Sequence, residues 1–268
     1  MNKTEPKTLT LKHRQQITPN MLRLTLNGPA LDAIIQAYGE EYANHYAGAY
    51  IKLELTEEGS AYIESADVSQ EPRLRTYSIR RFDIQAKEID IDFVLHGNEP
   101  SNGLASYWAQ NANIGSKISI RGPGSIKPVE TSADAFCLAA DMTALPALST
   151  VLEQLHSDAI GFAVIQVTSE ADQQPLNKPD GIELIWVTSG ADHQDKSPLV
   201  EVFENQPWPS GVVFAWAACE FSSMRQLRKY LRNEKSVDKD NLYLSSYWKQ
   251  GRTEDQHKID KRKDLEQQ

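Results

Sequence analysis

The sequence predicts a two-domain protein: a six-stranded antiparallel β-barrel followed by an α/β domain built on a parallel sheet. In the first half, about six short segments alternate apolar and polar residues, and turn residues separate them. In the second half, apolar strand-like runs alternate with helical patterns, which is typical of a parallel sheet covered by helices on both faces. A length of 268 residues also fits two domains, because domain sizes centre on about 100–150 residues.

The barrel strands follow from the period-two pattern. They are expected around residues 9–11, 22–26, 51–55, 74–79, 89–95 and 118–120, the last ending at Gly122-Pro123-Gly124. Two segments interrupt them. Residues 30–47 form a polar, Tyr-rich insertion with partial helical character, and residues 103–110 have the pattern of a short helix.

The second domain is predicted from a change in the hydrophobic pattern after the barrel, where strand-like runs begin to alternate with helical ones. Strands are expected at 135–140, 162–168, 184–188, 212–218 and 242–245, with helices at 144–156 and 222–233. Proline and polar residues replace the strand pattern at 126–132, so we place the domains at 1–128 and 129–268. The tail, 253–268, is densely charged and lacks Gly and Pro, which predicts a solvated helix or disorder.

Composition excludes several classes of protein. Acidic residues outnumber basic ones by 37 to 28, so the net charge of −9 argues against a partner that is a nucleic acid or an anionic membrane. The longest apolar stretch, Val212–Cys219, is too short for a bilayer, which needs about 20 residues. Met1–Thr10 lacks the apolar core of a signal peptide. We expect a monomeric, soluble protein of the cytoplasm.

The cysteines exclude some cofactors. Cys137 and Cys219 lie far apart, and no CxxC pair occurs, so iron–sulfur clusters and cysteine-based zinc sites are not expected. The motifs of zinc hydrolases, α/β-hydrolases and Walker-type NTPases are missing as well. We expect no resident metal.

The segment Arg73–Arg80 offers the chemistry of a phosphate-bearing aromatic cofactor. Arg75 can bind phosphate, Tyr77 supplies an aromatic face, and Ser78 supplies a hydroxyl. On a strand, Arg75 and Tyr77 point to one face and Thr76 and Ser78 to the other. An exposed strand whose arginines are merely solvated explains the same residues.

A resemblance to a known family favours the cofactor-binding explanation over the solvated strand. Arg75-Thr76-Tyr77-Ser78 matches the R-x-Y-[ST] flavin signature of the ferredoxin–NADP reductase superfamily. Further motifs follow in order between about residue 8 and residue 257, and together they resemble the siderophore-interacting protein family of FAD-dependent ferric-siderophore reductases. These motifs are Asp92–Gly97, Gly103–Ala109, Gly115 with Gly122-Pro123-Gly124, Leu138–Ala147, Trp216–Glu220 and Tyr247–Arg252 with Glu254-Asp255.

The resemblance implies FAD as cofactor and a set of residues that contact it. Arg75 would pair with the pyrophosphate, Tyr77 would stack on the isoalloxazine, and Ser78 would bond near its N5. The turn at the start of the short helix would complete a phosphate cradle. The residues implied in cofactor binding are Arg75, Thr76, Tyr77, Ser78, Asp92, Val94, His96, Gly97, Gly103, Ala105, Ser106, Asp141 and Thr143. The neighbouring carboxylates Asp90 and Asp92 are otherwise explained by solvation, and Trp108 by packing or by contact with adenine.

The substrate implied is a ferric siderophore of the hydroxamate or catecholate type, often anionic. A net-negative protein needs a local positive pocket to attract such a chelate. The candidates are Lys52, Lys127, Lys249 and Arg252, with Arg80 and Arg81 as weaker ones. For each of them alone, a solvated surface charge is the better explanation. The hypothesis is that they converge.

The electron donor stays open between NADH, NADPH and reduced ferredoxin. The architecture favours a nicotinamide cofactor, but no G-x-G-x-x-G occurs, and Ala140 and Met142 stand where the family often has Gly and Glu. Cys219 stands where the family commonly has glycine. It either approaches a nicotinamide or is a buried small thiol.

The function expected is reduction of siderophore-bound Fe(III) to Fe(II) by electron transfer from the flavin, with no side chain acting as acid or base. Two alternatives remain: a general NAD(P)H flavin reductase or ferredoxin–NADP reductase-like enzyme, and a protein that binds an iron chelate without reducing it.

Overall fold

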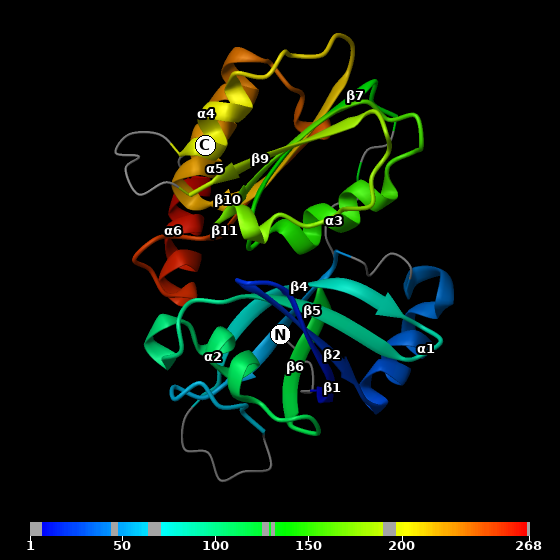
Figure 1. Cartoon of the computed structure of the whole chain (residues 1–268), viewed down its shortest axis with the longest axis vertical. Helices are drawn as coiled ribbons and strands as arrows, with labels where there is room; N and C mark the ends of the chain where they lie inside the picture. The colour runs from blue at the N-terminus through cyan, green and yellow to red at the C-terminus, as the bar shows by residue number, and fades with distance from the viewer. Residues whose placement is uncertain are drawn as a thin grey trace. The chain divides into compact units, whose positions relative to one another are not determined.

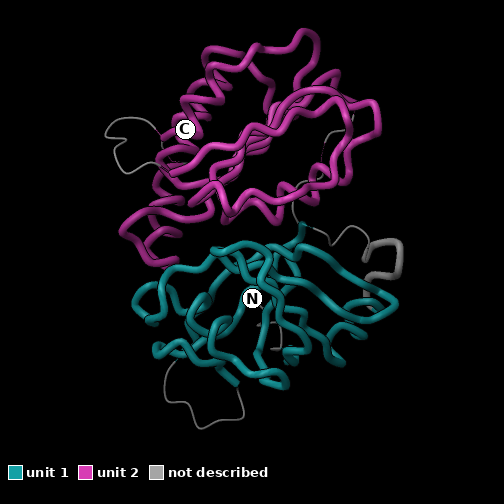
Figure 2. The backbone as a smooth tube through the Cα atoms, viewed as in Figure 1, with its two compact units in different colours: residues 1–126 teal, residues 127–268 magenta. Residues whose placement is uncertain are grey.

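The chain forms two compact units, Met1–Ile126 and Lys127–Gln268 (Figures 1 and 2). This computed structural model describes residues 7–43, 48–63, 71–124, 129, 132–189 and 197–266. The first unit is a closed six-stranded antiparallel barrel and the second an α/β unit with a five-stranded parallel sheet. The predicted fold class is therefore confirmed.

The barrel strands are joined in the order β1-β2-β5-β4-β3-β6, and every neighbouring pair is antiparallel. The strands are β1 (Lys7–Thr18), β2 (Met21–Asn27), β3 (Tyr50–Leu55), β4 (Arg73–Asp83), β5 (Glu88–Val94) and β6 (Lys117–Gly124). Helix α1 (Pro29–Ala43) occupies most of the Tyr-rich insertion, and α2 (Leu104–Asn111) is the short helix that the sequence predicts. The 3₁₀ turn η2 (Pro100–Asn102) precedes α2.

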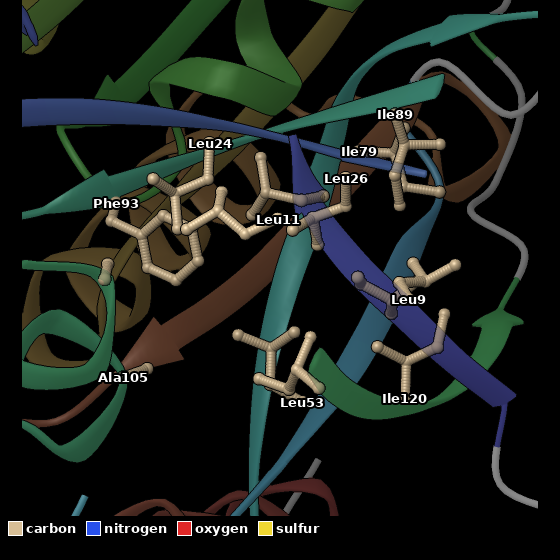
Figure 3. Packing of buried hydrophobic residues seen from close by; sticks show 14 of the residues in the cluster. Leu9, Leu11, Leu24, Leu26, Leu53, Ile79, Ile89, Phe93, Ala105 and Ile120 are labelled. Carbon is tan, nitrogen blue, oxygen red and sulfur yellow. The ribbon is translucent and has the colours of Figure 1, made fainter. Parts of the chain in front are cut away.

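The barrel interior is filled by the apolar half of each alternating strand. Figure 3 shows leucine, isoleucine and phenylalanine side chains from β1, β2, β3, β4, β5 and β6 packed together, and α2 adds Ala105. Removal of this surface from water is the main term that stabilises the barrel.

The polar half of β5 is also buried, which corrects the expectation that Asp90 and Asp92 are solvated. Asp90 and Asp92 are only 4% and 6% exposed. Arg23 donates to both oxygens of Asp92, from Nε at 2.6 Å and Nη2 at 2.8 Å. Asp90 accepts from Thr25 Oγ1 and Arg81 Nε, each at 2.7 Å. Buried carboxylates need such partners, so this face of β5 joins β2 and β4 by charge.

The second unit contains parallel strands in the order β11-β10-β7-β8-β9. They are β7 (Ala135–Asp141), β8 (Gly161–Val167), β9 (Ile182–Thr188), β10 (Val213–Glu220) and β11 (Leu242–Trp248). The helices are α3 (Leu145–Gln154), α4 (Pro198–Glu204), α5 (Phe221–Lys229) and α6 (Glu254–Glu266). Short turns are η3 (Glu170–Asp172), the π-helical η4 (Tyr230–Glu234) and η5 (Lys239–Asn241).

Helices cover both faces of this sheet. Alternate residues of β7 pack with α4 and α5 in one cluster, while α3 lies on the opposite face (Figure 1). The central strand β7 is buried along its whole length, as expected for a parallel strand covered on two sides. Strands β7 and β10 are neighbours, yet the chain leaves β7 toward β8 and returns later to β10. The carboxyl ends of β7 and β10 therefore form the topological switch point, where open α/β sheets bind ligands.

The tail forms a helix, which is one of the two expectations for it, but α6 docks on its own unit instead of being wholly solvated. His257 and Asp264 of α6 are 5% and 8% exposed. Asp264 accepts from Arg228 of α5 in a bidentate pair, at 2.7 and 2.8 Å. His257 Nε2 lies 2.9 Å from Ser246 Oγ of β11. None of the helices in the described ranges is long and apolar enough to cross a membrane.

Candidate functional site

Strand β4 carries the Arg75–Ser78 motif at a place where two strands of the barrel separate. β4 pairs with β3 from Arg73 to Ser78, but its ladder with β5 covers only Ile79–Asp83. The motif thus lies beyond the end of the β4–β5 ladder. A flat ring placed along this strand would meet backbone groups as well as side chains.

The Arg75 guanidinium, like that of Arg14, donates to a backbone carbonyl, whereas other barrel arginines form ion pairs. Arg23, Arg81 and Arg121 each pair with a carboxylate. Arg75 is half-buried and donates from Nη1 to the carbonyl oxygen of Leu74 at 2.8 Å. Within the described ranges it has no carboxylate partner. A cation held in this way suits an anionic ligand, because no internal anion competes for it.

Aromatic contacts join the motif to helix α2. The ring centroids of Tyr77 and Phe93 lie 4.5 Å apart at an interplanar angle of 36°, and those of Phe93 and Trp108 lie 6.2 Å apart. Tyr77 is half-buried, so its ring is fixed by Phe93 and still partly accessible. Trp108 is 4% exposed and belongs to the core, which favours packing over contact with a ligand.

The turn after β5 and the start of α2 are held together by hydrogen bonds. The backbone N–H of His96 donates to Ser106 Oγ at 3.1 Å, and Gln110 Nε2 donates to the Gly97 carbonyl oxygen at 2.8 Å. Gly103 precedes the helix with a φ of 149°, which favours glycine, and a Cβ there would lie 3.9 Å from His96 Cδ2. The structure thus brings four predicted residues together around the helix start. Its free N–H groups suit an anion.

Other residues predicted to contact the cofactor also have contacts within the barrel. The carboxylate of Asp92 accepts from Arg23 and so joins β5 to β2, and its contact with the cofactor stays a prediction. The Ala105 side chain lies in the barrel core, and Val94 ends β5 with 9% exposure. The Ser106 hydroxyl is engaged by the backbone of His96.

Lys52 lies on the face of the barrel that carries Thr76. In register it stands opposite Thr76 of β4 on one side and Arg121 of β6 on the other. Arg121 is paired with Glu54, whereas Lys52 has no carboxylate partner among the described residues. Lys127, the other cation expected near it in sequence, lies outside the described residues.

In the second unit, Asp141 and Thr143 lie at the topological switch point. Asp141 accepts hydrogen bonds from the Thr143 N–H at 2.9 Å, Thr143 Oγ1 at 2.5 Å and Trp248 Nε1 at 2.8 Å. Burial raises the pKa of Asp141, and these hydrogen bonds oppose the rise. Because Trp248 ends β11, the Asp141–Trp248 bond ties β7 to β11 across the end of β10. Thr143 and Trp248 thus both donate to the carboxylate of Asp141.

Cys219 and Met142 fill space around this point. Cys219 is 0% exposed, and burial raises its pKa well above the usual value, with the nearby carboxylates of Asp141 and Glu220 adding to the rise. It is therefore a protonated, buried thiol. Met142 Sδ accepts from the Thr168 N–H at 3.3 Å and from Thr168 Oγ1 at 3.2 Å, so it packs against the end of β8.

Lys249 and Arg252, two of the predicted substrate cations, converge. They are the first and last residues of a tight turn closed by Arg252 N–H to the Lys249 carbonyl at 3.1 Å, with Gly251 at a φ of 70°. Lys249 Nζ lies 2.7 Å and Arg252 Nε 3.3 Å from the same oxygen, Oδ2 of Asp260 in α6. The hydrogen bond from Lys249 lowers the pKa of Asp260 below its usual value.

Sequence reasoning missed Asp260 because the tail was taken as solvated. The signal was present: His257, Asp260, Lys261 and Asp264 recur at the three- and four-residue spacing of one helix face. That face is polar, so no apolar periodicity marks it as buried.

Comparison with known proteins agrees with the two units. Residues 10–126 match the family described as the siderophore-interacting FAD-binding domain, and residues 133–251 match the siderophore-interacting protein family. Ferric vibriobactin reductase ViuB of Vibrio cholerae is 30% identical over 260 residues, which cover 93% of this chain and 92% of that protein.

Solved structures are similar over nearly the whole chain. The siderophore-interacting protein SipS from Aeromonas hydrophila has 32% identity and a TM-score of 0.80, covering 97% of this chain and 98% of that one. A siderophore utilization protein from T. fusca has 28% identity and a TM-score of 0.77, covering 94% and 96%. With matching motifs, barrel and parallel sheet, this chain belongs to the siderophore-interacting protein family.

Proposed function

We propose that this protein is an FAD-dependent oxidoreductase that reduces siderophore-bound Fe(III) to Fe(II). One observation carries the proposal. The half-buried Arg75 guanidinium has no carboxylate partner in the described ranges, and Tyr77 follows it by two residues on β4, beyond the end of the ladder with β5. The name of the relative ViuB, ferric vibriobactin reductase, supports the choice of substrate class.

The residues present fit FAD. Arg75 would bind the pyrophosphate, and the N–H groups at the start of α2 would provide further donors. Tyr77, backed by Phe93, would hold the isoalloxazine ring, with Ser78 as a hydrogen-bond partner. When bound, FAD supplies the ability to accept two electrons and to deliver them one at a time.

The chemistry of iron explains why a single electron releases it. Hydroxamate and catecholate oxygens hold hard Fe(III) far more tightly than Fe(II), so uptake of one electron loosens the chelate. The protein's own part is to bind the chelate and screen its charge. We propose Lys52 in the barrel as one such cation, and Lys249 and Arg252 in the second unit as candidates of their own. Lys127 is proposed from sequence alone.

The donor is proposed to be NADH, NADPH or reduced ferredoxin. The parallel sheet with its switch point supports a nicotinamide cofactor, whereas Met142 and the docked helix α6 support ferredoxin. Deletion of residues 253–268 should raise NAD(P)H-dependent turnover if the tail blocks a nicotinamide site. Unchanged turnover would remove that idea.

The test of the proposed function is anaerobic. The flavin of the purified protein is photoreduced, a ferric siderophore is added, and flavin absorbance is recorded beside a ferrous-iron trap. The expected result is rapid flavin reoxidation with matching release of Fe(II). A reduced flavin that ignores the chelate would favour a general flavin reductase. Purified protein that carries and binds no flavin would refute the proposal.

A further inference from the structure

Helix α6 is attached to its unit by polar contacts. Among the side chains that the structure describes, those that contact the rest of the unit include His257, Asp260, Lys261 and Asp264, while Ile259 is 55% exposed. The His257 ring also lies edge-on to Phe221, with ring centroids 6.0 Å apart. Lys261 Nζ donates to Ser245 Oγ at 3.1 Å and to the Ser246 carbonyl at 3.3 Å. Such a helix is held mainly by hydrogen bonds and ion pairs, which anions and salt can weaken.

Asp260 is one of these side chains, and it meets the proposed substrate cations. Its Oδ2 is shared between Lys249 Nζ and Arg252 Nε, so one carboxylate oxygen bridges two cations. A catecholate or hydroxamate oxygen is the same kind of acceptor and would take the same place. The site is accessible from solvent, because the Lys249, Arg252 and Asp260 side chains are 27%, 48% and 19% exposed.

We propose that Asp260 is an internal competitor for the chelate: its carboxylate occupies the Lys249–Arg252 cation pair and must be displaced when an anionic ferric siderophore binds. This inference rests on the proposed function. It adds a specificity-determining residue, since Asp260 lowers the charge of the cation pair from two positive charges to one. The most highly charged chelates therefore lose the most affinity, and an anionic ligand left after reduction dissociates faster.

Displacement of Asp260 does not require α6 to detach. One turn further on, Asp264 holds the helix to α5 through its bidentate pair with Arg228, whose side chain is only 15% exposed. The Asp260 pairs are more exposed, and exposed ion pairs are weak. The side chain can thus yield its place while the helix stays docked.

The experiment compares two substitutions that remove the same charge from the same helix. Asp260→Asn removes the competitor. Asp255→Asn is the matched control, because Asp255 is 58% exposed and faces Lys258, at 3.6 Å, rather than the cation pair. Asp260→Ser is a second variant that also removes the charge. An effect caused by the lost charge should appear in both variants, although their side chains differ. Trypsin protection of α6 reports whether the helix is still docked.

The probes are Ga(III) complexes, which have the charge of the ferric complexes and no accessible divalent state. Binding is measured by calorimetry at low and high salt. For a trianionic tris-catecholate complex we expect both Asp260 variants to bind about fivefold more tightly than wild type, the factor that corresponds to release from one exposed ion pair. A neutral tris-hydroxamate complex should bind equally to all variants. The gain should shrink at high salt.

The outcomes separate this inference from the function on which it rests. If wild type binds the complexes and the Asp260 variants match Asp255→Asn, only the inference is wrong. Weaker binding by the Asp260 variants would also overturn it, because Asp260 would then position the cations. Wild-type protein that binds neither complex would refute both the role of the cation pair and the inference.

Discussion

The bidentate pair between Asp264 and Arg228 should decide whether α6 stays docked. Asp264 is 8% exposed and Arg228 15%, so the pair is nearly dry. Removal of one partner from a buried ion pair costs about 3–5 kcal/mol, because it leaves the other charge without compensation. The contact of Asp264 with Arg225, at 3.2 Å, adds little, since the Arg225 side chain is 55% exposed.

The expected magnitude for Asp264→Asn is therefore a loss of about 3 kcal/mol in the docking of α6. Such a loss raises the population of the detached helix about 100-fold, because each 1.4 kcal/mol is about a factor of ten. The effect should stay local. The barrel and the parallel sheet have hydrophobic cores of their own, and α6 contributes mainly polar contacts.

Limited proteolysis with trypsin measures this population. The helix contains the cleavage sites Lys258, Lys261, Arg262 and Lys263, which are protected while it is docked. Cleavage within α6 should be much faster in Asp264→Asn, and amide exchange across 254–266 should rise with it. Asp255→Asn, with the same charge change at an exposed position, should behave as wild type. Equal cleavage rates for Asp264→Asn and wild type would refute the reasoning.

Three further predictions concern single groups. Arg75→Ala should weaken FAD binding about 100-fold, because two charge-assisted hydrogen bonds are lost. Arg73→Ala removes an exposed ion pair from the same strand and should leave the flavin content unchanged. Equal losses of flavin in the two variants would contradict the role of Arg75. Burial lowers the pKa of His257 below 6.5, so the docked helix favours the neutral ring. Docking of α6 should therefore weaken as the pH falls from about 6.5 downward. A His257→Gln variant should lose this pH dependence in the trypsin assay. Cys219 should resist a thiol-alkylating reagent at pH 8 in folded protein and react after unfolding, as mass spectrometry can check.

Local patterns were enough to predict much of the fold. Alternation in β5, with Ile89, Ile91 and Phe93 on one face, predicts both a strand and its buried side. The Arg75–Ser78 motif is four consecutive residues, so its candidate role follows from sequence alone. Helix α4 was missed because its seven residues are too few for a helical period to be recognised.

Long-range charge pairs could not be predicted in this way. Asp92 binds Arg23, which precedes it by 69 residues, and Asp264 binds Arg228 across 36 residues. Charged residues with such partners look like solvated ones in a sequence, because nothing local marks the partner. For this reason the sequence predicts solvated carboxylates on β5 and does not predict the ion pairs that hold α6.

The polar attachment of α6 also has a calorimetric consequence. The heat capacity of unfolding comes mainly from apolar surface that becomes hydrated, and polar surface contributes with the opposite sign. Among the described side chains, detachment of α6 hydrates mainly charged and hydroxyl groups, together with the His257–Phe221 ring contact, so we expect a small heat-capacity change. The docking equilibrium should then follow temperature almost linearly, without the curvature of the whole domain, and respond steeply to ionic strength. Between temperature and ionic strength, we therefore expect ionic strength to be the condition that releases this helix while the rest of the unit stays folded.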